Sequence, residues 1–184
     1  MSPNEKVIET AQGELDLLKE WYRYNSYVRK KYFDAIEKLA PEEITKDRGA
    51  SHPSLIDILS HTLGAYLHWF FNFYGLPMPD LNQGPDTMQT LREDERKIDS
   101  AVMAFVEGLK PADLDNTFDA SDETNSFRFT LRQMMPHLIE EELQHRGEIN
   151  ALLWQMDVDP PITDWLDWKI ELGEIKPIPK KAKK

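Results

Sequence analysis

The sequence predicts an all-α protein built as a single four-helix bundle with long crossover connections. Four segments repeat apolar residues every three or four positions, which is the pattern of a helix that buries one face. Prolines and glycines cluster between these segments and end them. The chain has 184 residues, 40% hydrophobic and 30% charged, so it is long enough for one domain with a substantial core.

The first two helices are expected over residues 13–40 and 54–75. The first carries one apolar stripe, interrupted by Asn25, and Pro41 ends it. The second begins at Ser54, with Asp57 three residues later in the manner of a capping box. It is apolar nearly all round, so we expect it to be the most buried helix. The segment LPMPDLNQGP that follows carries three prolines and a glycine and predicts an extended crossover.

The last two helices are expected over residues 86–109 and 130–156. A polar loop over residues 115–128, with a short hairpin around TNSFRF, separates them. Thr130 and Gln133 form a second capping box, and Pro136 should kink the first turns of the last helix. After it, TDWLDWKIEL is typical of a short amphipathic helix packed on the outside of the bundle. We therefore assign residues 1–12 to an N-terminal tail, 13–170 to the bundle and 171–184 to a basic, disordered tail.

Composition narrows the classes of function. The net charge of −11 argues against nucleic acid binding, which recruits Lys and Arg on one face. The absence of cysteine excludes disulfides, thiolate metal ligands and a cysteine nucleophile. We see neither a secretory signal nor a segment typical of a membrane span. We therefore expect a cytoplasmic protein that contacts neither nucleic acid nor a membrane.

Ionisable residues interrupt two of the apolar stripes. Glu141 and His145 occupy consecutive positions of the stripe on the last helix and can face one ion, because residues i and i+4 lie one above the other. His61 lies in the middle of the second helix, and Asp57 one turn earlier could accept its other ring proton. Two histidines and one glutamate form a known ligand set for a catalytic metal with an open position.

Other interpretations of these residues stay open. Glu141 and His145 could form a buried ion pair without a metal. His137, one turn before Glu141, could be an additional ligand. We expect His52 to be an exposed loop residue and His68 to pack in the core. Glu142-x-x-His145 has the spacing of a di-iron carboxylate site, but the second motif that such a site needs is absent.

The motifs together resemble the DinB-like superfamily of metal-binding four-helix bundles, over about residues 14 to 168. They are the YN pair at Tyr24-Asn25, LIDILSHTLGAYLHW around His61, HLIEEELQHRGEINALL around His145, and DPPITDWLDW. The resemblance implies that one histidine of the second helix and two histidines four apart on the last helix bind a divalent ion, usually zinc or nickel. His61 and His145 match two of these positions, whereas Glu141 stands at the third.

With Glu141 at this position the ligand set contains a carboxylate, which is a harder ligand than an imidazole. Two histidines and one carboxylate suit zinc, manganese or ferrous iron. His137 matches a frequent histidine of the family that is not ordinarily a ligand. The resemblance implies a stress-linked, metal-dependent enzyme, either a transferase that uses a low-molecular-weight thiol or a hydrolase. The motifs do not specify its catalytic residues or its substrate. The alternative is a non-catalytic, homodimeric bundle in which the Glu–His network sets helix register.

Overall fold

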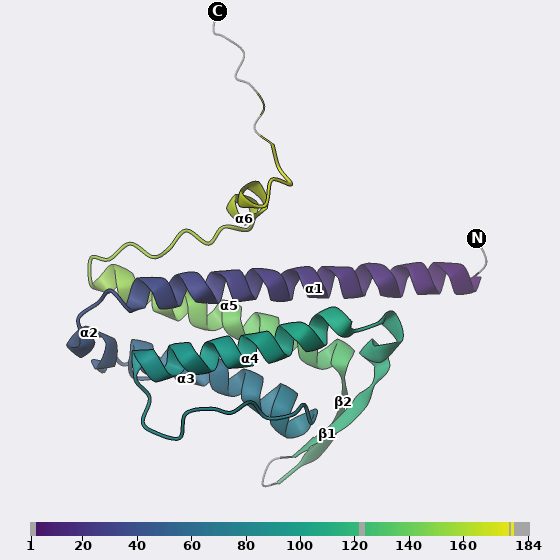
Figure 1. Cartoon of the computed structure of the whole chain (residues 1–184), viewed down its shortest axis with the longest axis horizontal. Coiled ribbons are helices and arrows are strands. Elements are labelled where there is room, and N and C mark those ends of the chain that lie inside the picture. Colours follow the sequence, from purple (N-terminus) through teal and green to yellow (C-terminus); the bar gives the residue numbers. More distant parts are fainter. Residues whose placement is uncertain (1–2, 122–123, 177, 179–184) are drawn as a thin grey trace, which may run out of the picture.

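Four long helices run side by side and form the bundle, as the computed structural model of the chain shows in Figure 1. The structure describes residues 3–121, 124–176 and 178, with side chains from Thr10 onward. The long helices are α1 (Pro3–Ile36), α3 (Leu55–Tyr66), α4 (Met88–Gly108) and α5 (Leu131–Gln155), and α3 continues as the π-helix η1 (Leu67–Phe73). Shorter elements are α2 (Pro41–Thr45), the 3-10 helix η2 (Pro111–Asp115) and α6 (Trp165–Glu171).

The connections determine which helices are neighbours. α1 packs against α4 and α5, and α3 packs against the same two helices, so α1 and α3 lie diagonally across the bundle. Figure 1 shows that α3 and α4 run in the same direction, so residues 74–87 must return along the bundle. This segment is the expected crossover. The second long connection joins helices of opposite direction and is not a crossover; it forms η2 and a hairpin instead.

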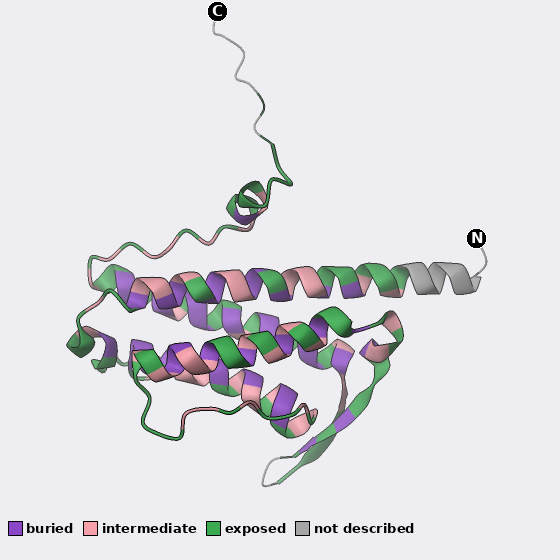
Figure 2. Cartoon of the chain, in the orientation of Figure 1, coloured by how far each residue is buried: buried purple, intermediate pink, exposed green. Residues whose placement is uncertain are grey.

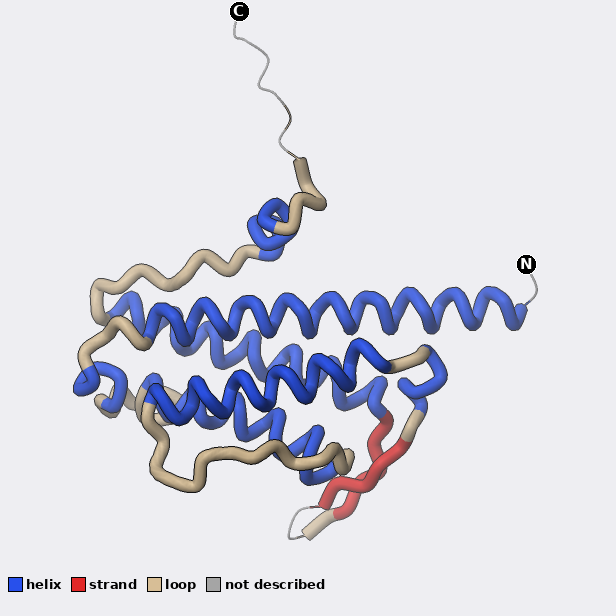
Figure 3. The backbone as a smooth tube through the Cα atoms, viewed as in Figure 1, coloured by secondary structure: helices blue, strands red, loops and turns tan. Residues whose placement is uncertain are grey.

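The expected helix limits are correct at the capped ends and wrong at the start of α1. Capping boxes begin α3 at Ser54 and Asp57, and α5 at Thr130 and Gln133. α1, in contrast, begins at Pro3, so residues 3–12 belong to a helix and not to a tail. These residues lack an apolar stripe because they extend beyond the other helices, as Figure 3 shows. α5 runs through Pro136 without interruption.

Apolar side chains fill the space between the four helices, and Figure 2 shows the buried positions facing inward. Every helix of the bundle contributes fully buried residues. They include Val28, Phe33 and Ile36 from α1, Leu55 and Ile58 from α3, Val106 from α4, and Leu138 and Leu153 from α5. Among the described helices, none is both long enough and apolar enough to cross a membrane.

The hairpin consists of β1 (Thr117–Ser121) and β2 (Ser126–Thr130), shown in red in Figure 3. The strands pair antiparallel, with Phe118 opposite Phe129. β2 leads directly into α5, because Thr130 is both the last residue of the strand and the N-cap of the helix. The hairpin therefore lies beside the first turns of α5, close to η1, with which β1 is in contact.

The expected amphipathic helix near the C-terminus is α6. Its Trp165 lies 4.6 Å from Trp21 between ring centroids, and Trp168 is buried, so α6 packs on the outer face of α1. Residues 172–176 follow without a regular element. The rest of the basic tail expected over residues 171–184 lies outside the described residues, except for Ile178.

Candidate metal centre

Two neighbouring helices bring the three predicted ligands together. α3 supplies His61, and α5 supplies Glu141 and His145 from adjacent turns. The Nε2 atom of His61 lies 2.9 Å from Oε1 of Glu141, and the Nε2 atom of His145 lies 3.2 Å from the same oxygen. Ligand atoms bonded to one ion at about 2.0–2.2 Å are separated by roughly 3 Å. Each of the two imidazole nitrogens therefore lies at about this distance from the carboxylate oxygen.

His52 joins this group, which the sequence analysis did not predict. Its ring stacks on that of His61, with centroids 3.9 Å apart, and lies 5.4 Å from the ring of His145. Each of the three histidines offers a nitrogen within 4.8 Å of the others. The expectation that His52 is an exposed loop residue is wrong, because the cluster half-buries its side chain.

Hydrogen bonds at both ends hold the loop that carries His52. Arg48 donates its backbone N–H to the carbonyl of Pro53 at 2.7 Å, and its guanidinium donates to the carbonyl of Glu43 at 2.6 Å. The hydroxyl of Ser51 donates to Glu148 on α5 at 2.7 Å. These contacts anchor the backbone of a segment that lacks regular secondary structure and so bring His52 beside His61.

Glu148 also contacts His145, with its Oε2 atom 2.9 Å from Nδ1. Both ring nitrogens of His145 therefore face carboxylates, although a neutral imidazole carries only one N–H. When Nδ1 holds the proton and donates it to Glu148, Nε2 presents a lone pair toward Glu141. A cation between Nε2 and Glu141 fits this arrangement. Without a cation, both contacts are satisfied only if His145 is doubly protonated and donates to Glu148 and to Glu141. That arrangement is the buried ion pair without a metal.

The charge states of the group suit a cation. Burial would raise the pKa of Glu141, but its contacts with His61 and His145 hold that pKa below its usual value. Burial and the neighbouring His61 and His145 lower the pKa of His52. At neutral pH the group therefore offers a carboxylate and a neutral imidazole, the forms in which these side chains bind metals.

Three further sequence expectations are corrected or refined by the structure. Asp57 accepts hydrogen bonds from the backbone N–H and hydroxyl of Ser54, and within the described residues it makes none with His61. His137 is exposed and forms a second, outer group with Glu140 and Glu141, whose ligand atoms lie within 4.8 Å of one another. His68 is exposed on η1 and not packed in the core.

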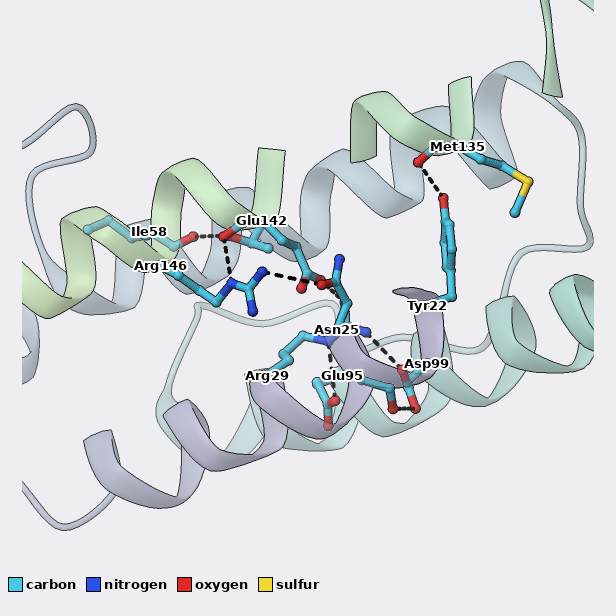
Figure 4. A network of polar contacts seen from close by, with 11 residues as sticks. Tyr22, Asn25, Arg29, Ile58, Glu95, Asp99, Met135, Glu142 and Arg146 are labelled. Atoms are coloured by element: carbon cyan, nitrogen blue, oxygen red, sulfur yellow. Dashed lines mark hydrogen bonds and ion pairs between the residues drawn. The ribbon is translucent and has the colours of Figure 1, made fainter. Parts of the chain in front are cut away.

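A second polar group, drawn in Figure 4, lies inside the bundle. Glu142 is buried and pairs with Nη1 of Arg29 at 2.5 Å, and Nη2 of Arg29 binds Asp99 at 2.8 Å. Glu95 lies 3.5 Å from Nε of the same guanidinium and is also buried. Burial raises the pKa of Glu142 and Glu95, an effect that the nearby Arg29 opposes. Of the two adjacent glutamates of α5, Glu142 therefore belongs to the core and Glu141 to the candidate metal centre.

Residues of the two sequence motifs around Tyr24 and His145 contact each other in this region. The guanidinium of Arg146 lies 5.3 Å above the ring of Tyr24, and its Nη2 donates to Oδ1 of Asn25 at 3.4 Å. Asn25 is fully buried, as its place in the stripe of α1 predicts. These contacts join α1 to α5 one residue beyond His145, so they set the position of the ligand-bearing helix.

The fold and the site define a helical bundle with a histidine–carboxylate group suited to a divalent cation. The model of the DinB family matches residues 9–175, and the chain belongs to this family. Protein DinB of Bacillus subtilis (strain 168) is 22% identical in an alignment of 157 residues, and the match covers 78% of this chain and 88% of that protein.

Two solved structures share the fold. A DinB-like protein from Bacillus cereus ATCC 10987 superposes with a TM-score of 0.62 at 18% identity, covering 79% of this chain and 94% of that one. A DinB-like protein from Bacillus subtilis gives a TM-score of 0.56 at 16% identity, covering 79% of this chain and 98% of that one. These matches confirm the predicted all-α bundle of the DinB type.

Proposed function

We propose that His61, Glu141 and His145 bind a divalent cation, with His52 as an additional ligand, and that the protein is a metal-dependent enzyme. The observation that carries the proposal is the convergence of two imidazole Nε2 atoms, from two helices, on one oxygen of Glu141. Imidazole and carboxylate ligands together suit zinc, nickel, manganese or ferrous iron.

Each side chain has a distinct task in this proposal. Glu148 holds the proton on Nδ1 of His145 and leaves Nε2 free to bind. Glu141 contributes the single negative charge that balances part of the charge of the cation. His52 comes from a loop and lies on the outer side of His61, where it can leave or join the ligand set without a change in the helices.

The bound cation would act as a Lewis acid that lowers the pKa of a thiol or a water and so yields a nucleophile at neutral pH. Because the chain has no cysteine, a thiol nucleophile must come from a low-molecular-weight compound. The proposed reaction is therefore transfer of a small thiol to an electrophile, with hydrolysis as the variant in which water takes its place.

Metal binding is the first test. The purified protein is stripped with a chelator and dialysed separately against Zn²⁺, Ni²⁺, Mn²⁺ and Fe²⁺, and bound metal per chain is measured by elemental analysis. We expect about one ion per wild-type chain, and a loss of tight binding in His61→Ala and Glu141→Ala, since each removes a direct ligand. His68→Ala, which removes an exposed histidine of η1, should bind as the wild type does.

Two results would contradict the proposal. Absence of bound metal in the wild type with all four ions would favour the non-catalytic bundle, in which the Glu–His network only sets helix register. Equal metal content in the wild type and in both ligand variants would place the ion elsewhere. If metal binds as expected, turnover of an electrophile with and without a small thiol separates thiol transfer from hydrolysis.

A further inference from the structure

An open pocket of about 370 Å³ lies between η1, β2 and the first turns of α5. Its walls are Trp69, Phe129, Gln133, Met134 and His137; we call it the aromatic pocket. The ring of Trp69 lies 5.4 Å from that of Phe129 and 5.2 Å from that of His137, both in edge-on arrangements. Pockets that bind small molecules have volumes of about 300–1,000 Å³, so the aromatic pocket can hold a compound of one or two rings.

The aromatic pocket adjoins the candidate metal centre. His137 forms one of its walls and lies one turn before Glu141 on α5, and a ring nitrogen of His137 is within 4.8 Å of a Glu141 oxygen. Glu141 in turn contacts Nε2 of His61 at 2.9 Å. A compound seated against Trp69 and His137 therefore lies within one side-chain length of the metal ligands.

The chemistry of the walls selects the kind of compound. The described lining residues include no Lys or Arg, so no side chain of the pocket attracts an anion, and the carboxylate of Glu140, which lies beside His137, repels one. Aromatic walls favour a flat apolar group that can stack or meet them edge-on. The amide oxygen of Gln133 accepts a hydrogen bond from the backbone N–H of Thr130 at the helix cap, so Gln133 is a polar lining residue that the cap holds in place.

The local backbone supports a binding role. Trp69 lies in η1, a π-helix of seven residues. π-Helical turns are rare and occur frequently at functional sites. Here the π-helix continues α3, so one continuous segment carries both His61 and the aromatic wall of the pocket.

We infer that the aromatic pocket binds the uncharged aromatic part of the substrate, whose reactive group reaches the centre formed by His61, Glu141 and His145. This inference rests on the proposed function for the role of the metal centre. It narrows the substrate class to neutral aromatic electrophiles and excludes phosphorylated and carboxylated compounds as preferred substrates.

Binding of two matched probes tests the specificity. 2-Naphthalenemethanol is neutral, and 2-naphthoate has the same two rings with a negative charge at pH 7.5. We expect the neutral probe to bind the full chain at least about tenfold more tightly. Phe129→Ala should weaken that binding about tenfold, since one lost ring contact with its buried area corresponds to about 1.4 kcal/mol. Phe127→Ala is the control, because Phe127 lies two residues away on β2, is exposed and does not line the pocket.

Proximity to the centre is tested with Mn²⁺. In the Mn²⁺-loaded wild type, the proton resonances of bound 2-naphthalenemethanol should broaden, and Glu141→Ala should abolish the broadening without abolishing probe binding. Failure of the neutral probe to bind, equal binding of the two probes, or broadening that is absent although Mn²⁺ is bound would each overturn the inference. Failure of Mn²⁺ and the other ions to bind would instead overturn the proposed function, and metal analysis of the same samples distinguishes the two cases.

Discussion

Replacing Arg29 by methionine should destabilise the protein by about 3–5 kcal/mol, the usual cost of removing one partner of a buried ion pair. The side chains of Arg29 and Glu142 are only 5% and 3% exposed, and their charged atoms are 2.5 Å apart. The substitution would leave Glu142, Glu95 and Asp99 without the guanidinium that they share, and the more distant Arg146 and Arg92 would offset only part of the charge of Glu142 and Glu95. Arg23→Met is the matched control on the same helix, because Arg23 and its partner Glu107 are 51% and 40% exposed. Such a surface pair contributes about 0–1 kcal/mol.

The cost of Arg29→Met should also depend on pH. Burial raises the pKa of Glu142 and Glu95 above their unfolded values, and Arg29 opposes that rise. A carboxyl group with a raised folded pKa contributes stability that is present at low pH and is lost as the pH rises through the folded pKa. Removing the guanidinium raises both pKa values further. The variant should therefore lose more stability relative to the wild type at pH 8 than at pH 5.

Urea unfolding of the wild type, Arg29→Met and Arg23→Met at the two pH values measures both effects, provided that the slope of the free energy against urea is shared. Comparison with the wild type at each pH cancels the other titrating groups. A cost of Arg29→Met that is no larger than that of Arg23→Met would refute the role of the buried network. A cost that is larger at pH 5 than at pH 8 would refute the assignment of raised carboxyl pKa values.

Three further predictions concern the centre, the core and the helix cap. Glu148→Gln should weaken metal binding about 10–100-fold by calorimetry, since it loosens the orientation of His145; unchanged affinity would show that Glu148 does not position the ligand. Leu138→Ala should reduce the free energy of unfolding by about 2–5 kcal/mol, whereas Leu143→Ala on the exposed face of α5 should change it by less than about 0.5 kcal/mol. Ser54→Ala should cost about 1 kcal/mol in the same assay and leave metal affinity unchanged, and a loss of affinity would restore a role for this cap in the site.

Much of the fold could be predicted from the sequence because helices that bury one face repeat with a fixed period. The capping boxes at Ser54 and Thr130 were correct for a similar reason, since they depend only on residues three apart. The start of α1 was not predicted, because residues 3–12 continue a helix beyond the bundle without an apolar face. The direction of the second long connection depends on tertiary packing, which no local pattern encodes.

The residues of the candidate metal centre could be predicted only where they lie on helices. His61, Glu141 and His145 follow the helical period, and the structure brings them together. His52 was missed because it lies in a loop, whose path is set by distant contacts such as that between Ser51 and Glu148. The sequence shows only that His52 lies shortly before the start of the second helix. That position does not determine where its side chain lies.

The adjacent glutamates of α5 constrain how that helix can turn about its own axis. Successive residues of a helix are rotated by about 100°, so Glu141 meets His61 while Glu142 meets Arg29 deep in the core. A rotation of α5 that moved Glu141 away from the histidines would also separate Glu142 from Arg29. The buried ion pair between Glu142 and Arg29 therefore restricts rotation of α5 about its own axis. The orientation of Glu141 toward the histidines thus depends on residues that do not contact the candidate centre.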